Sequence, residues 1–152
     1  NAQIILPGVS MGAATVLMAS GEELPENVKV IIADCGYTSE WDEFKCEANA
    51  LHIPWFPVLN AASVLSRLRD GYDFKQASAL EKVKQSRIPT LFIHGSDDEL
   101  VPYSMLDKLY SAAACEKECL TVNGAGHALS SSVEPELYWN TVESFIDKYL
   151  EK

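Results

Sequence analysis

Two short segments of the sequence are apolar on both faces, and they restrict the fold more than any other feature. They are Val28–Ala33 (VKVIIA), in which Lys29 is the one polar residue, and Thr90–His94 (TLFIH). Strands of this kind are typical of a parallel sheet, because helices cover both of its surfaces. Both segments are therefore predicted to be buried strands of an α/β protein.

The remaining segments predict alternating strands and helices. The apolar run Gln3–Leu6 ends at Pro7-Gly8 and is predicted to be the first strand, and Glu118–Val122 is a weaker last strand. The predicted helices, identified from small residues or from apolar residues at helical spacing, are Met11–Ser20, Ala77–Lys84, Tyr103–Ala114 and Pro135–Leu150. This alternation favours an α/β sheet with right-handed crossovers.

One stretch between two of the strands is too long for a simple crossover. The Thr-Ser pair at 38–39 can cap a helix, the sequence IPWFP at 53–57 interrupts that helix, and a second apolar stripe at helical spacing follows. We therefore divide the chain into a core, residues 1–37 and 72–152, and a helical insertion at about 38–71.

The composition argues against several classes of function. The chain carries 22 acidic and 12 basic residues, a net charge of −10, and such a surface repels phosphate backbones, so no nucleic-acid partner is expected. No apolar run is long enough to span a membrane. The four cysteines lack C-x-x-C spacing and are interpreted as small core residues. We expect neither a metal nor another cofactor.

The pentapeptide Gly8-Val9-Ser10-Met11-Gly12 has the pattern G-x-S-x-G and lies directly between the first strand and the first helix. In this pattern a serine occupies a sharp, strained turn, and small residues two positions before and after it let the strand and the helix approach closely. The Met11 backbone N–H would then point to the place where an oxyanion develops. The pattern predicts that Ser10 is a nucleophile; an ordinary glycine-rich turn is the alternative.

A nucleophilic serine needs a base, and the base needs an acid that orients it. His127 follows the last strand and a Gly-Ala-Gly loop, a position from which a loop can bring the imidazole to Ser10. His52 lies in the insertion and His94 ends a strand, so both are assigned structural or surface roles. Three acids compete for the orienting role because each follows the end of a strand: Asp34, Asp97 and Asp98.

Two segments resemble signatures of the α/β-hydrolase superfamily. The sequence HGSDDELVP at 94–102 looks like H-G-x-x-D-x-x-V-P, and this match places the acid at Asp98, with Asp97 at a free position. The sequence GAGH at 124–127 resembles the histidine loop of the same superfamily. With Ser10, the motifs follow the order Ser, Asp, His of that fold. The chain is most similar to its serine esterase, or acyl-hydrolase, branch.

This resemblance implies a fold and a position within it. The nucleophile of an α/β-hydrolase lies near the middle of its domain, whereas here it is residue 10. We therefore expect the C-terminal half of the fold, a mostly parallel sheet flanked by helices with a helical lid-like insertion. The loop that supplies a second oxyanion donor would lie upstream, so the isolated chain is expected to be poorly active. A cytoplasmic location is the default, and an export signal or membrane anchor would also lie upstream.

The implied reaction is acyl transfer from a small-molecule substrate to water. Ser10 would attack the carbonyl, His127 would take and return the proton, and Asp98 would hold the imidazole tautomer. An ester is the default substrate, because an alkoxide leaving group demands least of the acid step. The alternatives are a serine peptidase of the same fold and a non-catalytic binding protein on the same scaffold.

Aromatic residues of the insertion are candidates to bind the substrate. Trp41, Phe44, Trp55 and Phe56 can line an apolar acyl pocket beneath a lid, and Trp41, Trp55 and Phe56 are taken as the binding residues. The alternative is that these side chains pack the insertion onto the sheet.

Overall fold

The computed structural model describes residues 2–150 and contains four strands and seven helices in that part of the chain. The strands are β1 (Ile4–Val9), β2 (Val28–Asp34), β3 (Thr90–Gly95) and β4 (Lys117–Val122). The helices are α1 (Met11–Ala19), α2 (Glu40–Ala50), α3 (Trp55–Asp70), α4 (Ala79–Val83), α5 (Ser104–Ala112), α6 (Ser130–Val133) and α7 (Pro135–Tyr149). Within residues 2–150, none of these helices has the length and apolar character needed to cross a bilayer.

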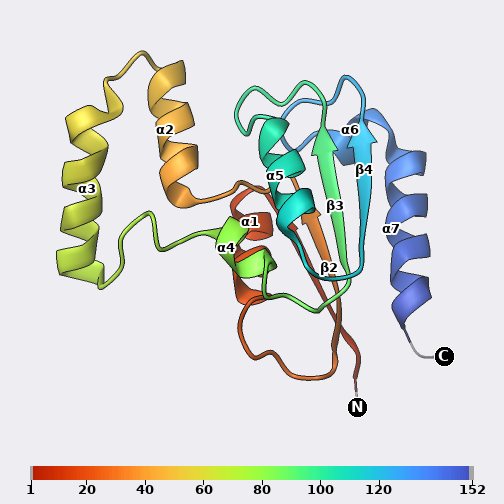
Figure 1. Cartoon of the computed structure of the whole chain (residues 1–152). Helices are drawn as coiled ribbons and strands as arrows, with labels where there is room; N and C mark the ends of the chain where they lie inside the picture. Colours follow the sequence, from red (N-terminus) through yellow and green to blue (C-terminus); the bar gives the residue numbers. More distant parts are fainter. Residues whose placement is uncertain (1, 151–152) are drawn as a thin grey trace.

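The four strands form one parallel sheet in the order β1-β2-β3-β4 (Figure 1). The two segments predicted to be buried on both faces, β2 and β3, are its central strands, and every residue of β3 is buried. Because the strands are parallel, their carboxyl ends lie at one edge, where α/β proteins place their sites. The predicted α/β class is confirmed.

Helices cover both faces of the sheet, as Figure 1 shows. On one face, α1, α4 and α5 pack around Phe92 and Ile31. On the other face, α7 places Phe145 and Val142 against Leu91 and its neighbours. Each large apolar side chain buried in this way stabilises the fold by about 1.5–3 kcal/mol. The two cores fix the sheet edge from which the site residues extend.

β1 extends farther than the sequence predicts. The predicted end at Pro7-Gly8 is wrong, since the strand continues to Val9. Within residues 2–150, β2 is the one strand that pairs with β1. The Ser10 N–H donates to the Asp34 carbonyl, so by the alternation of a strand the nitrogen of Pro7 faces away from β2, and the proline removes no hydrogen bond between these two strands. Ile4 and Val9 of this strand are 37% and 49% exposed.

α2 and α3 form a helical hairpin that stands beside the core (Figure 1). α2 begins after Ser39, whose Oγ accepts a hydrogen bond from the Asp42 N–H at 3.1 Å. The predicted interruption corresponds to the start of α3, where Phe56 has non-helical backbone angles. An antiparallel bridge between Ser39 and Ser78 joins the two ends of the hairpin to the core. The division of the chain into core and insertion stays a prediction.

Candidate active site

Ser10 lies between β1 and α1 in a strained backbone conformation, with φ 54° and ψ −117°. Strain of this kind costs about 1–3 kcal/mol and persists only where the surroundings enforce it. Here the Ser10 N–H donates to the Asp34 carbonyl at 2.9 Å, which continues the pairing of β1 with β2. The backbone of Gly12 approaches Gly8 so closely that a Cβ on Gly8 would lie 2.3 Å from the Gly12 oxygen. Position 8 therefore requires glycine.

Gly12 has a different role from the one the sequence predicts. A Cβ added to Gly12 would meet no described heavy atom within 4 Å. The close contact is between the backbone of Gly12 and the place that a Cβ of residue 8 would occupy. The expectation that both positions must be small for the same steric reason is therefore wrong at position 12.

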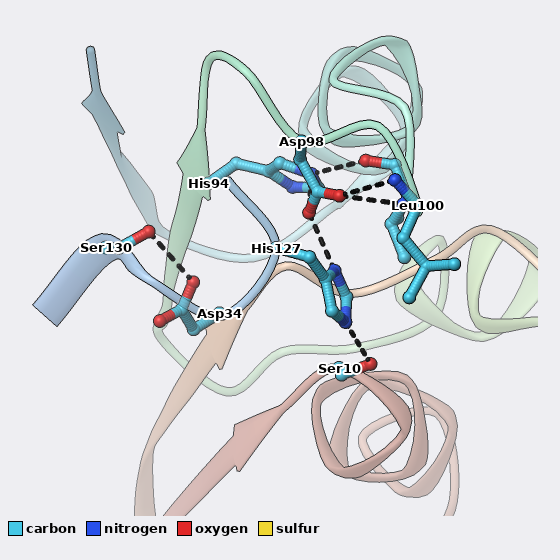
Figure 2. Close-up of polar contacts among 8 residues, drawn as sticks. Ser10, Asp34, His94, Asp98, Leu100, His127 and Ser130 are labelled. Carbon is cyan, nitrogen blue, oxygen red and sulfur yellow. Dashed lines mark hydrogen bonds and ion pairs between the residues drawn. The ribbon is translucent and has the colours of Figure 1, made fainter. Parts of the chain in front are cut away.

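Ser10, His127 and Asp98 form a continuous hydrogen-bonded chain (Figure 2). The Ser10 hydroxyl donates to Nε2 of His127 at 2.8 Å, and Nδ1–H of His127 donates to Oδ2 of Asp98 at 2.8 Å. The three residues follow the carboxyl ends of β1, β4 and β3. In this tautomer Nε2 is the free base that faces the hydroxyl, which is the arrangement that acyl transfer requires. Their catalytic roles stay predictions.

The Asp98 carboxylate is buried, and both of its oxygens are hydrogen-bonded. Oδ1 accepts from the N–H groups of Leu100 at 3.0 Å and Val101 at 2.9 Å, and Oδ2 lies 3.3 Å from Nε2 of His94. Burial by itself raises the pKa of Asp98, but hydrogen bonds from His94, His127 and Val101 outweigh it and hold that pKa below its ordinary value. Asp98 is therefore ionised at neutral pH.

The other two candidate acids have other partners. Oδ1 of Asp34 accepts from the Ser130 hydroxyl at 3.4 Å (Figure 2), and Oδ1 of Asp97 accepts from Ser96 at 2.7 Å. Burial raises the pKa of Asp34. The structure thus pairs His127 with Asp98, the acid that the resemblance selects.

The two remaining histidines lie where structural roles are expected. His94 is fully buried in β3, and its Nε2–H donates to the Val101 carbonyl at 2.9 Å. His52 lies between α2 and α3 with a positive φ of 57°. His94 also lies next to the Asp98 carboxylate, which sequence reasoning did not anticipate.

A pocket of about 180 Å³ opens beside Ser10. It is lined by Ser10, Met11, Tyr37, Glu40, Glu43, Phe44, Glu47 and Leu100. The Met11 N–H belongs to the first turn of α1, so it has no carbonyl partner within the helix and can donate to a ligand.

The aromatic residues predicted to bind substrate lie in the hairpin. The ring centroids of Trp41 and Trp55 are 6.4 Å apart, and those of Trp55 and Phe56 are 6.1 Å apart. Trp55 lines a second, apolar pocket of about 370 Å³ between α2 and α3, and Phe56 is 66% exposed. The pocket beside Ser10 has none of these three residues in its lining; Phe44 and Glu47 line both pockets.

Sequence reasoning missed two features of the site. The first is Cys35, whose Sγ lies within 4.8 Å of ligand atoms of Asp98 and His127. Burial, and then the charge of Asp34, raise the pKa of this thiol to about 12, so it is neutral. The second is a set of glutamates on α2 that line the pocket: Glu40, Glu43 and Glu47. Their spacing of three and four residues, which places side chains on one helix face, was the available signal.

The whole chain, residues 1–152, matches the prolyl oligopeptidase family. The chain belongs to that family. Members of this family are α/β-hydrolases, so the superfamily resemblance and the α/β fold that it implies are confirmed. The roles of the three motifs stay predictions.

Individual proteins are also similar to this chain in sequence or in fold. The uncharacterized protein YqkD of Bacillus subtilis is 30% identical over 141 residues, which cover 92% of this chain and 46% of YqkD. An esterase of Pyrococcus furiosus has a similar structure, with a TM-score of 0.72 at 18% identity over 98% of this chain and 55% of the esterase. The acylaminoacyl peptidase of Pyrococcus horikoshii gives 0.66 at 16% identity over 99% of this chain and 24% of the peptidase. The chain spans about half the length of the curated relatives it matches.

Proposed function

We propose that this chain carries the catalytic centre of a serine hydrolase that cleaves carboxylic esters of small molecules through an acyl-enzyme on Ser10. One observation carries the proposal: the Ser10 hydroxyl, the His127 imidazole and the ionised Asp98 carboxylate are joined by two hydrogen bonds of 2.8 Å each. The strained turn at Ser10 supports it, because backbone strain is retained where it positions a functional group.

The proposed reaction has two steps. In the first, the Ser10 oxygen attacks the ester carbonyl, Nε2 of His127 takes the serine proton, and the Met11 N–H stabilises the oxyanion. The carbon–oxygen bond to the alcohol then breaks, and His127 returns the proton to that alcohol. In the second step, water attacks the acyl-serine carbonyl with His127 again as base, the bond between the acyl carbon and the Ser10 oxygen breaks, and His127 returns the proton to Ser10 as the carboxylic acid leaves. Ionised Asp98 stabilises the imidazolium in both steps.

The α2–α3 hairpin is proposed as a lid that binds the acyl group. The apolar pocket between its helices adjoins the pocket beside Ser10 through Phe44 and Glu47, which line both. An acyl chain attached to Ser10 would pass the Phe44 ring to reach the apolar space around Trp55. Packing of these aromatic residues within the hairpin is the competing explanation.

A serine peptidase is the second candidate function. The prolyl oligopeptidase family description and the similarity to an acylaminoacyl peptidase favour it. The same hydrogen-bonded residues serve ester and peptide cleavage, since His127 would protonate either an alkoxide or an amine. A non-catalytic binding protein is disfavoured by the intact arrangement of the three side chains.

A fluorophosphonate probe tests the proposal. We expect the purified full-length protein, which would include the upstream oxyanion loop that the resemblance implies, to be labelled. The S10A variant should lose labelling, and a control variant at an exposed serine of α5, S111A, should keep it. Turnover of a panel of esters and peptides then separates esterase from peptidase. Failure of the wild-type protein to label would favour a non-catalytic scaffold.

A further inference from the structure

Three carboxylates line the pocket beside Ser10, although no reaction step above uses them. Glu40, Glu43 and Glu47 come from successive turns of α2 and face this space. Glu43 is only 7% exposed. The Oε2 atoms of Glu40 and Glu43 are both buried and have no hydrogen-bond partner among the described residues.

A buried carboxylate without a partner is unusual, because burial removes its hydration and nothing replaces it. The site compensates in part by keeping the proton: burial, and then the charges of Glu47 and Asp98, raise the pKa of Glu43 to about 7. Burial, and then the three glutamates, also raise the pKa of Tyr37 to about 12. The negative charges of the three glutamates are therefore concentrated at the wall of the pocket next to Tyr37.

We propose that this pocket is a subsite for a positively charged organic group of the substrate, a primary ammonium or a guanidinium held near the scissile carbonyl by Glu43 and its neighbours on α2. The inference rests on the proposed function of Ser10 and narrows its substrate class to cationic esters or amides. A cation in the pocket would be attracted by the three carboxylates and would donate hydrogen bonds to those of their oxygens that reach the pocket.

The shape of the pocket favours an organic cation over a metal ion. Its volume of about 180 Å³ is that of about six water molecules, which is ample for an alkylammonium or a guanidinium group. Among the described residues, the one cluster with ligand atoms close enough to hold a metal ion is Cys35, Asp98 and His127, and the glutamates do not form another. The three glutamates come from successive turns of α2, and the aromatic residues Tyr37 and Phe44 also line the pocket.

An isosteric pair of substrates tests the inference. The ethyl esters of Nα-acetyl-arginine and Nα-acetyl-citrulline differ in charge but hardly in shape. We expect the wild-type protein to favour the arginine ester in kcat/KM by about tenfold or more, the effect of one charge-assisted hydrogen bond. The E43Q variant should bring this ratio close to one.

Two controls keep the result interpretable. E99Q changes an exposed glutamate in the loop near Asp98, outside the pocket lining, and should keep the wild-type ratio. E47Q alters a less buried member of the cluster and should lower the ratio even where E43Q fails to fold. Labelling of each variant by a neutral fluorophosphonate shows that Ser10 is reactive.

The outcomes separate the two proposals. Equal turnover of both esters by a wild-type protein that the neutral probe labels would overturn the cation subsite and leave the serine hydrolase intact. A protein that the probe does not label contradicts the proposed function itself. A preference for the arginine ester that persists in both E43Q and E47Q would place the cation elsewhere and also overturn the inference.

Discussion

Nε2 of His94 lies 3.3 Å from Oδ2 of Asp98, the same carboxylate oxygen that accepts the 2.8 Å hydrogen bond from Nδ1 of His127 (Figure 2). One oxygen of the acid is thus shared by a buried histidine of β3 and by the histidine that faces Ser10. The other oxygen is held by two backbone N–H groups. The orientation of His127 therefore depends on a carboxylate that is fixed from three sides.

We predict that H94F shifts the acid sensitivity of the protein. Because the pKa of Asp98 is lowered in the folded state, its stabilising contribution is present above the unfolded value of 3.8 and is lost as the pH falls through the lower folded value. Removing the His94 hydrogen bond raises the folded pKa, so the contribution shrinks and is lost at a higher pH. Urea unfolding between pH 2 and 6 measures this, with H94Q, which keeps a side-chain N–H donor, as control. Identical pH profiles for H94F and wild type would contradict the role given to His94.

The strained backbone at Ser10 is predicted to lower the free energy of unfolding, although the reaction requires this residue. S10A should lower kcat by at least about 10⁴-fold, because the nucleophile is lost. S10G should be equally inactive but about 1 kcal/mol more stable than S10A, since glycine adopts a φ of 54° without strain. Thermal unfolding of the two variants compares them directly. If S10A and S10G unfold at the same temperature, the turn is not strained in solution.

Two of the three residues that the structure joins by hydrogen bonds could be predicted from local features of the sequence. Ser10 and His127 occupy loops that follow strand ends, and this placement is visible in apolar runs followed by glycine. Asp98 was one of three acids with equivalent placement, and only the resemblance to a known signature separated it from Asp34 and Asp97. Neither the hydrophobic periodicity nor the composition of the sequence distinguishes Asp98 from the other two acids.

Other features depend on tertiary packing and could not be predicted. The burial of Glu43 and the position of Cys35 beside His127 arise from how α2 and β2 meet the loops of the other strands. The continuation of β1 through Pro7 depends on the register with β2, which turns the proline nitrogen away from that strand and which the sequence does not reveal. α6 has four residues and no apolar periodicity, so no pattern indicated it.

Gly8 and Gly12 are predicted to respond oppositely to alanine. G8A places a Cβ against the Gly12 backbone and should destabilise the protein by about 3 kcal/mol or more, since backbone atoms cannot give way easily. G12A adds a Cβ in open space within α1 and should stabilise by roughly 0.5–1 kcal/mol. Melting temperatures measure both effects, at roughly 2–4 °C per kcal/mol for a chain of this size. A G12A variant as unstable as G8A would show that Gly12 meets a close neighbour.

Phe44 is predicted to control the length of the acyl group more than Phe56 does. Phe44 lines both pockets, whereas Phe56 is largely exposed. With p-nitrophenyl esters, F44A should lower the ratio of kcat/KM for octanoate to that for acetate by about tenfold, the loss of burial of roughly two methylene groups. F56A should change this ratio less. An equal or larger effect of F56A would place the acyl chain on the outer side of the hairpin.

The buried carboxyl of Glu43 should make stability depend on pH in the direction opposite to Asp98. Its pKa is raised from 4.5 to about 7 by burial, by Glu47 and by Asp98, so the folded state holds the proton more tightly than the unfolded state. The contribution of Glu43 to the free energy of unfolding is therefore most favourable below pH 4.5 and decreases as the pH rises toward 7. Above pH 7 the ionised Glu43 carboxylate destabilises the folded state by roughly 3 kcal/mol relative to its protonated form.

E43Q carries no charge at any pH, so it should be more stable than wild type at pH 8 and similar to it at pH 4.5. Urea unfolding of E43Q, with E99Q as control, tests this, and an equal effect of E43Q at both pH values would mean that Glu43 is not held as a buried, protonated acid. Adding an alkylammonium ion at pH 8 should restore part of the wild-type stability, because a cation that binds only the folded state stabilises it.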